Sequence, residues 1–248
     1  MLVQVLPSCY WYGKTEEENE PENLAEIRRL ATPRPDLSLS GFSAEDFKKV
    51  ETAYCTAFKR WELSASAIPF IEGYNPQDAG GGTLFNNLAL PTEDTSTQTK
   101  PDIYNGARRG RLDQKIRKDL KNLIIPSPKD GLPVPPNFFM EAQGDPGDPN
   151  VAKRQACFYG ALGARGIQAL RSYQPGKSHC ETVYDNRVYT ITAAYIDGVL
   201  SLFAHHLKGP TDQVKRPTCF MVPLKSFLLM ESLESFREGA TAYRNARD

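Results

Sequence analysis

The sequence predicts a single α/β or α+β domain built on a mixed β-sheet. Helical and extended segments follow one another in the order helix, strands, helix, strand, helix, hairpin, helix, without an internal repeat. Of the 248 residues, 40% are hydrophobic, and they include 12 Phe, 11 Tyr and 2 Trp. A chain of this length and composition can bury a substantial core, so disorder throughout is excluded.

Charge and cysteine content narrow the classes of function. The 30 basic and 30 acidic residues give a formal net charge of 0. This argues against a protein that coats nucleic acid through a general positive charge, but it does not exclude local basic patches. The five cysteines include no C-x-x-C pair, which favours a reducing, intracellular location, nuclear or cytoplasmic. No run approaches ~18 consecutive apolar residues, and no secretory signal begins the chain, so no membrane contact is expected.

Residues 1–42 predict an acidic N-terminal arm that precedes a domain over 43–248. The stretch 16–26 holds six glutamates and no basic residue, and Pro33 and Pro35 interrupt regular structure. Two interpretations stay open: a solvated arm, or an arm that shields a basic groove of the same chain. The sequence leaves open a protein partner that docks on this region or on 207–248.

The first helix is predicted over 43–62. Ser43 is a good N-cap, and Asp46 completes a variant of the capping box. Glu51 borders the apolar stripe of this helix, so its carboxylate points either into a cleft or to water. The stripe consists of Phe47, Val50, Tyr54, Phe58 and Trp61.

The region 68–104 reads as extended and broken by turns. Short strands are predicted at 68–71 and 83–85, and a further strand is predicted to end at 100–104. The stretch 108–121 then carries seven cations against two aspartates. Its apolar residues predict an amphipathic helix with a basic outer face, which is either a solvated surface or the lining of a phosphate-binding groove. The apolar residues are Leu112, Ile116, Leu120 and Leu123, and the first cations are Arg108, Arg109 and Arg111.

The second half contains the clearest local signals. An apolar strand is predicted at 137–143 and a helix rich in small residues at 151–171. Asp197-Gly198 separates two alternating segments and predicts a tight hairpin. The last helix is expected to begin after Pro223. His205 and His206 are neighbours on the second hairpin strand, so they point to opposite sides and cannot both face one site.

Two carboxylates are the main candidates for chemistry. Asp102 follows Pro101, which suits the end of a strand, and Glu141 follows three apolar residues, where a charge needs a cleft, a partner or a metal. Gln143 shares the face of Glu141 in a strand. Oxygen ligands on two strands can hold Mg²⁺ or Mn²⁺. The plainer alternatives are a turn former for Asp102 and a structural ion pair for Glu141.

The order of these motifs resembles the PD-(D/E)XK nuclease-like superfamily, which has a restriction-endonuclease-like fold. Its common core is helix, three strands, helix, strand, which implies an α/β fold with a mixed β-sheet core flanked by helices. The resemblance covers roughly 43–206 and is closest to a domain of uncharacterised fungal proteins. It rests on FNNL (85–88), PDIYNGAR (101–108), PNFFMEAQG (136–144) and AKRQACFYGALGAR (152–165).

The resemblance implies a role for individual residues. Asp102 and Glu141 match the metal-binding acids, with the main-chain carbonyl of Ala142 as a third ligand and Glu51 as an accessory carboxylate. Gln143 stands where the family pattern has lysine, and it would orient water by hydrogen bonds without a positive charge. The nucleic acid would meet Gln155 and Tyr159, which match a Q-x-x-x-Y element, together with Lys153.

The implied function is metal-dependent hydrolysis of phosphodiesters in DNA or RNA. The missing lysine also supports an alternative, a catalytically inactive nuclease-like fold that serves as a nucleic-acid- or protein-binding module. In a third interpretation the motifs occur by chance in an unrelated α/β domain, and Asp102 and Glu141 lie far apart.

Overall fold

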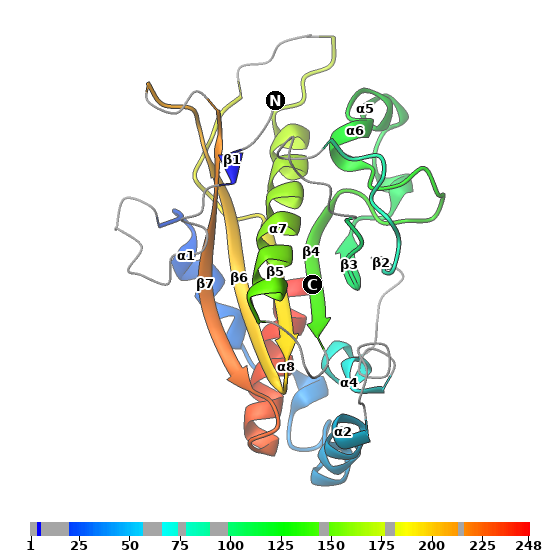
Figure 1. The fold of residues 1–248 in the computed structure, drawn as a ribbon, viewed down its shortest axis with the longest axis vertical. Coiled ribbons are helices and arrows are strands. Elements are labelled where there is room, and N and C mark those ends of the chain that lie inside the picture. Colours follow the sequence, from blue (N-terminus) through cyan, green and yellow to red (C-terminus); the bar gives the residue numbers. More distant parts are fainter. Residues whose placement is uncertain are drawn as a thin grey trace.

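Strands of the described chain form one mixed sheet in the order β1-β7-β6-β5-β4-β3-β2 (Figure 1). The computed structural model describes residues 4–5, 20–56, 66–73, 78–89, 99–143, 149–176, 182–212 and 216–248. The pairs β1/β7 and β4/β5 are parallel, and the other neighbours are antiparallel. The strands are β1 (Gln4–Val5), β2 (Ala79–Gly80), β3 (Ile103–Gly106), β4 (Pro136–Gln143), β5 (Thr190–Ile196), β6 (Val199–Lys208) and β7 (Thr218–Leu228).

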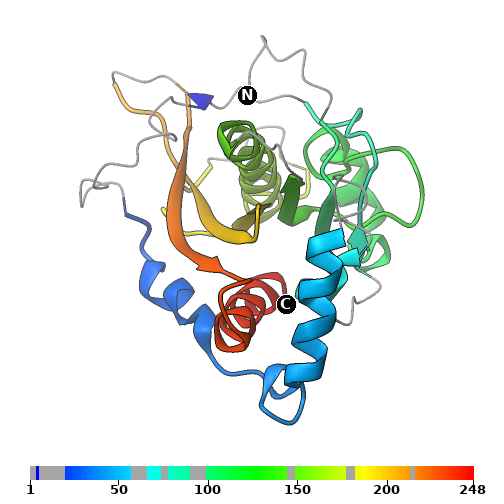
Figure 2. The ribbon, with the colours of Figure 1, turned by 60° about the horizontal axis from the view of Figure 1, so that its bottom comes forward.

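Helices cover both faces of this sheet, with α7 on one face and α8 on the other (Figure 2). The prediction of an α/β fold with a mixed sheet flanked by helices is therefore confirmed. None of the described helices is long and apolar enough to cross a lipid bilayer. The helices are α1 (Leu24–Ile27), α2 (Ala44–Thr56), α4 (Ile68–Glu72), α5 (Gln114–Asp119), α6 (Lys121–Ile124), α7 (Pro149–Arg171) and α8 (Leu233–Arg247), with 3₁₀ turns η3 (Arg28–Ala31), η4 (Pro35–Leu37) and η5 (Arg109–Arg111).

Strand β4 is buried on both faces, as expected for a strand between helical layers. Phe138, Met140 and Ala142 face the cluster that includes α4 and α8, whereas Phe139 faces α7. Because β4 and β5 are parallel, the chain must cross over between them, and α7 is that crossover. Glu141 alternates with Met140 and Ala142, so it belongs to the face that α7 covers.

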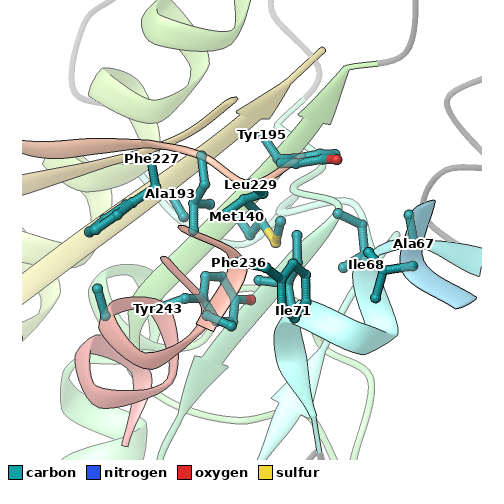
Figure 3. Packing of buried hydrophobic residues seen from close by; sticks show 14 of the residues in the cluster. Ala67, Ile68, Ile71, Met140, Ala193, Tyr195, Phe227, Leu229, Phe236 and Tyr243 are labelled. Atoms are coloured by element: carbon teal, nitrogen blue, oxygen red, sulfur yellow. The ribbon is translucent and has the colours of Figure 1, made fainter. Parts of the chain in front are cut away.

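The face opposite α7 carries the largest core cluster (Figure 3). Phe236, Ala240 and Tyr243 of α8 are buried there against β4, β5 and the end of β7. The segment 20–42, which lies within the predicted acidic arm, also contributes buried side chains, namely Leu24, Leu37 and Phe42. This segment is therefore packed against the domain. Residues 1–3 and 6–19, which include the first three glutamates of the acidic run, lie outside the described residues.

Local signals in the sequence predicted several elements correctly. The Ser43 backbone N–H donates to Asp46 Oδ2 at 3.0 Å, and the Asp46 N–H donates to Ser43 Oγ at 3.2 Å, as a capping box requires. Helix α2 is described to Thr56, so Phe58 and Trp61 lie outside the described part. At the hairpin, Asp197 and Gly198 have φ of 46° and 77°, the positive values of a type I′ turn.

The extended region predicted before residue 104 is wrong in detail. Residues 68–71 belong to helix α4, where Pro69 occupies the first turn and its missing N–H costs nothing. A short apolar run does not distinguish a strand from a buried helical turn. Residues 83–85 are not a strand, and strand β3 begins at Ile103 rather than ending near it.

Two further expectations are corrected. The stretch 108–121 is not one helix, because a 3₁₀ turn and the break at Leu120 divide it into η5, α5 and the start of α6. The last helix begins at Leu233, and residues 218–228 form strand β7 instead. Pro223 lies at the register shift between β6 and β7, where a residue without an N–H is tolerated in a strand.

Candidate functional site

The pairing of β3 with β4 brings Asp102 and Glu141 together. Ile103 pairs with Met140, so the antiparallel register places Asp102 opposite Glu141. The Asp102 backbone N–H donates to Glu141 Oε1 at 3.2 Å, and the Ala142 N–H donates to Asp102 Oδ2 at 2.9 Å. Each carboxylate therefore accepts a hydrogen bond from the backbone of the other strand, and the two acids are not far apart.

This pair concentrates negative charge at the edge of a buried layer. The Glu141 residue is only 1% exposed, whereas Asp102 is partly exposed to solvent. Like charges directly opposite each other on neighbouring strands destabilise a sheet, and the cost rises where water is excluded. A cation bound by both carboxylates would remove that repulsion.

Helix α7 packs on the face of the sheet to which Glu141 belongs, so residues of α7 form part of the surroundings of Glu141. The rings of Tyr159 and Phe139 stack with centroids 5.8 Å apart, and Phe139 precedes Glu141 by two residues. The crossover helix runs antiparallel to β4. The four residues before Tyr159 span about 6 Å along α7, and the two residues after Phe139 span about the same length along β4. Gln155 is therefore level with Glu141, and half-buried Lys153 lies in the same first turns of α7.

Tyr159 is a core residue and is not available for direct contact with nucleic acid. Its residue is 3% exposed, and its ring belongs to a cluster under the first half of α7. The helical spacing of Gln155 and Tyr159 is that of ordinary packing, and for Tyr159 packing prevails because α7 lies flat on the sheet. The other members of the cluster are Phe85, Leu88, Tyr104, Phe139 and Leu162.

Gln143 is the last residue of β4, where its backbone pairs with Ile196 of β5. Its side chain lies outside the part of the chain that the structure describes.

Glu51 does not join the two acids. It is exposed on α2, whose buried residues Phe47 and Val50 pack into the cluster on the opposite face of the sheet. Among the described residues, no group of three or more His, Cys, Asp or Glu side chains is arranged to hold a metal ion. In this structure Glu51, which the sequence suggested as an accessory carboxylate, is therefore not grouped with Asp102 and Glu141.

The arginines predicted to contact nucleic acid lie at the other end of β3. From Asp102 to Gly106 the strand rises about 13 Å, and the basic stretch begins beyond Gly106. Arg108 Nε lies 2.8 Å from Asp78 Oδ1, and Arg109 Nη1 lies 3.0 Å from Asp130 Oδ1, so both are paired. Arg111 is exposed. The basic stretch and the carboxylates therefore do not line one compact site.

The donor atoms at Asp102 and Glu141 suit a hard divalent cation. Mg²⁺ and Mn²⁺ take carboxylate and carbonyl oxygens, and Mg²⁺ is commonly held by one or two carboxylates while it keeps several waters. The Ala142 N–H donates to Asp102 Oδ2, so the backbone of the residue that follows Glu141 lies beside the pair. Two carboxylates and the Ala142 carbonyl are thus a chemically adequate set.

The two histidines of β6 are structural rather than catalytic. His205 Nε2 lies 2.8 Å from Thr192 Oγ1, and the His206 ring stacks on Phe220 with centroids 5.2 Å apart. Burial lowers the pKa of His205 to about 3 and the pKa of His206 to about 4. Both rings are therefore neutral and enclosed at pH 7. Their adjacency in the sequence gave no sign of this burial.

No family model, no curated protein and no solved structure matches this chain.

Proposed function

We propose that the chain hydrolyses phosphodiester bonds of DNA or RNA with Mg²⁺ or Mn²⁺ held by Asp102 and Glu141. The observation that carries this proposal is the reciprocal bonding of the two carboxylates, each to a backbone N–H of the other strand. Carboxylates held in that way are oriented before a metal arrives.

The order of elements supports a restriction-endonuclease-like fold. Helices α2 and α4 are followed by β2 and β3, then, after the inserted η5, α5 and α6, by β4, α7 and β5. Apart from that insertion, this succession resembles the helix, three strands, helix, strand order of the PD-(D/E)XK superfamily. Asp102 immediately precedes the second of these strands and Glu141 lies near the end of the third, which is where the resemblance expects the motif acids.

In the proposed site each residue has a distinct role. Asp102, Glu141 and the Ala142 carbonyl would hold the cation, which would supply polarisation of the phosphodiester and a lowered pKa for a bound water. The Ala142 N–H fixes the orientation of Asp102. Gln143 orients the attacking water through its amide, and Gln155, level with Glu141, contacts the phosphate backbone.

The test is a cleavage assay on labelled single- and double-stranded DNA and RNA with Mg²⁺, Mn²⁺ or EDTA. The key variant is Asp102→Asn, which keeps an acceptor for the Ala142 N–H but loses the charge. We expect metal-dependent cutting by the native chain and at least about a hundredfold loss in the variant, since one carboxylate ligand contributes several kcal/mol.

Two comparisons make that assay decisive. The variant Glu51→Gln changes an acid on the opposite face and should cut like the native chain. Gln143→Lys restores the family lysine and should raise the rate. Retained cutting by Asp102→Asn would exclude its role as a ligand, and cutting by Gln143→Lys alone would mean that the natural site is inactive.

A second candidate is a nuclease-like module that binds without cutting. It is favoured by the arrangement of the acids, because no third described acid approaches the pair and Gln143 supplies no charge. Thermal denaturation separates the two candidates. A working site is stabilised by Mn²⁺ through mass action in the native chain and not in Asp102→Asn, whereas a pure binding module shows no such shift.

A further inference from the structure

A cluster of exposed cations lies at the end of the sheet away from the carboxylate pair. The η5–α5–α6 segment protrudes at the upper right of Figure 1, while the start of β3 and the end of β4 lie below it. The cluster, which we call the basic surface, consists of Arg111, Lys115, Lys118, Lys121 and Lys129, all of them exposed.

The apolar side of the same segment forces these cations outward together. Leu112, Ile116, Leu120 and Leu123 pack against Ile124, Ile125 and Val134. On α5, Lys115 and Lys118 are three residues apart and share one side of the helix. The loop that carries Lys129 is tied to η5, because Arg109 Nη1 donates to the Lys129 carbonyl at 3.3 Å.

Nearby acids do not neutralise the basic surface. Asp130 pairs with Arg109, Asp119 accepts a hydrogen bond from the Tyr173 hydroxyl at 2.7 Å, and Asp113 caps α5 by accepting from the Lys115 N–H. In the part of the chain that the structure describes, none of the five cationic side chains forms an ion pair. The chain as a whole has a net charge of 0, so this surface is a local feature and not part of a general positive charge.

The composition of the basic surface indicates the chemical class of its partner. Large exposed hydrophobic side chains among the described residues are Leu39, Leu84, Val183 and Leu228, and none of them lies in 108–131. Binding to a lipid surface normally combines basic residues with apolar side chains that insert. A surface with charge and no apolar anchor instead matches a polymer of phosphates, whose bound counterions are released when cations replace them.

We propose that the basic surface binds the phosphate backbone of a nucleic acid, separately from the carboxylate pair. Both features lie on the face that α7 covers. Gln155 is level with Glu141, and Gly166 packs closely against the Leu123 carbonyl at the end of α6. These two positions are about 16 Å apart along α7. That spacing corresponds to roughly five nucleotides of one strand.

The experiment measures binding of a short labelled DNA duplex by fluorescence anisotropy, in EDTA and in the Asp102→Asn background, so that hydrolysis plays no part. Five phosphate contacts give a slope of about −4.5 for log affinity against log salt, or roughly a 500-fold loss between about 50 and 200 mM salt. In Lys115→Gln/Lys118→Gln the salt dependence should become less steep, with a slope about 2 closer to zero. In Lys115→Glu/Lys118→Glu the affinity should fall at least tenfold, as expected when two attractive contacts become repulsive.

A matched control reverses two exposed cations elsewhere. Arg29→Glu/Lys48→Glu changes the net charge by the same amount on η3 and α2, and it should retain the native affinity and slope. An equal loss in this control, or no salt-dependent binding by the parent protein, would overturn the proposal. So would stronger binding to vesicles of anionic lipid than to the duplex. Binding in this experiment, together with no cutting by the native chain in the cleavage assay with metal, would leave the basic surface in place and reject the hydrolytic proposal. If the native chain cuts and Lys115→Glu/Lys118→Glu changes neither the affinity nor the cleavage rate, the hydrolytic proposal would stand and the basic surface would be rejected.

Discussion

Gly160 of α7 lies directly against the imidazole ring of His205 on β6, so closely that a Cβ at position 160 would overlap the ring. Because position 160 has no side chain, α7 can pack close to the sheet at the position of this buried ring. In an isolated helix, glycine costs about 1 kcal/mol relative to alanine. Here the glycine is required by tertiary packing.

Gly160→Ala should therefore destabilise the protein, because overlap with the buried ring outweighs the gain in helix propensity. We expect a loss of about 1–3 kcal/mol in the free energy of unfolding, measured by urea denaturation. In the background His205→Ala the ring is absent, and the same substitution should be neutral or stabilising. An equal cost in both backgrounds would show that the glycine is needed for another reason.

The burial of His205 and His206 predicts an acid-sensitive fold. Their ordinary pKa of 6.5 applies to the unfolded chain, whereas in the folded chain the pKa values are lowered to about 3 and about 4. As the pH falls below 6.5, the unfolded chain takes up protons that the folded chain does not, so stability decreases. Between about pH 7.5 and 5.5 each histidine should cost roughly 1.4 kcal/mol.

Urea denaturation at several pH values tests this expectation. The variant His206→Phe keeps an aromatic ring against Phe220 but cannot be protonated. It should lose about half of the pH dependence above pH 5.5. A pH dependence equal to that of the native chain would mean that His206 is not the group responsible.

Arg244 should be difficult to replace even by lysine. The residue is 5% exposed, and its guanidinium donates to the Ile71 carbonyl at 2.9 Å, to the Phe70 carbonyl at 2.7 Å and to Asp36 Oδ2 at 2.8 Å. It thereby joins α8 to the end of α4 and to η4. An ammonium group cannot serve three acceptors in this planar arrangement.

For Arg244→Lys we expect a loss of roughly 2–3 kcal/mol in thermal or urea unfolding, because buried acceptors are left unsatisfied. Arg28→Lys is the matched control, since Arg28 is an exposed residue that pairs with Glu20 at 4.0 Å. Exposed pairs of this kind contribute about 0–1 kcal/mol. Equal effects in the two variants would contradict the assigned role of Arg244.

Tyr159 and Gln155 should separate stability from nucleic-acid binding. Tyr159→Leu removes the stacking on Phe139 and should cost about 1–3 kcal/mol in unfolding, with unchanged oligonucleotide affinity of the folded protein. Gln155→Ala should lower that affinity with little change in stability. A reversal of these two effects would return Tyr159 to the nucleic-acid-binding group.

Features governed by neighbouring residues could be predicted from the sequence. The capping box at Ser43, the strand that ends at Gln143 and the turn at Asp197-Gly198 depend on local backbone preferences. The strand β7 could not be predicted in this way, because Pro223 is unfavourable in a strand unless a register shift accommodates it. That shift arises only when β6 and β7 pair.

The candidate site shows the same limit. The order of the motifs indicated that Asp102 and Glu141 meet, and β3 and β4 bring them within hydrogen-bond reach of each other's backbone. The sequence could not tell which face of the sheet each helix covers. This choice separates Glu51 from the pair and buries Tyr159, and it follows from packing of the whole chain.

The two faces of the sheet are assembled from very different parts of the sequence, and this bears on the order in which they form. The α7 face is made largely by consecutive elements from β4 to β6, whereas the other face joins residues 37–71 to α8. Closing the longer loop costs more chain entropy, and contacts distant in sequence slow folding. We therefore expect amides of β4, α7 and β5 to gain protection from exchange before those of α4 and α8. The layer that carries the carboxylates would then be the first to take its native shape.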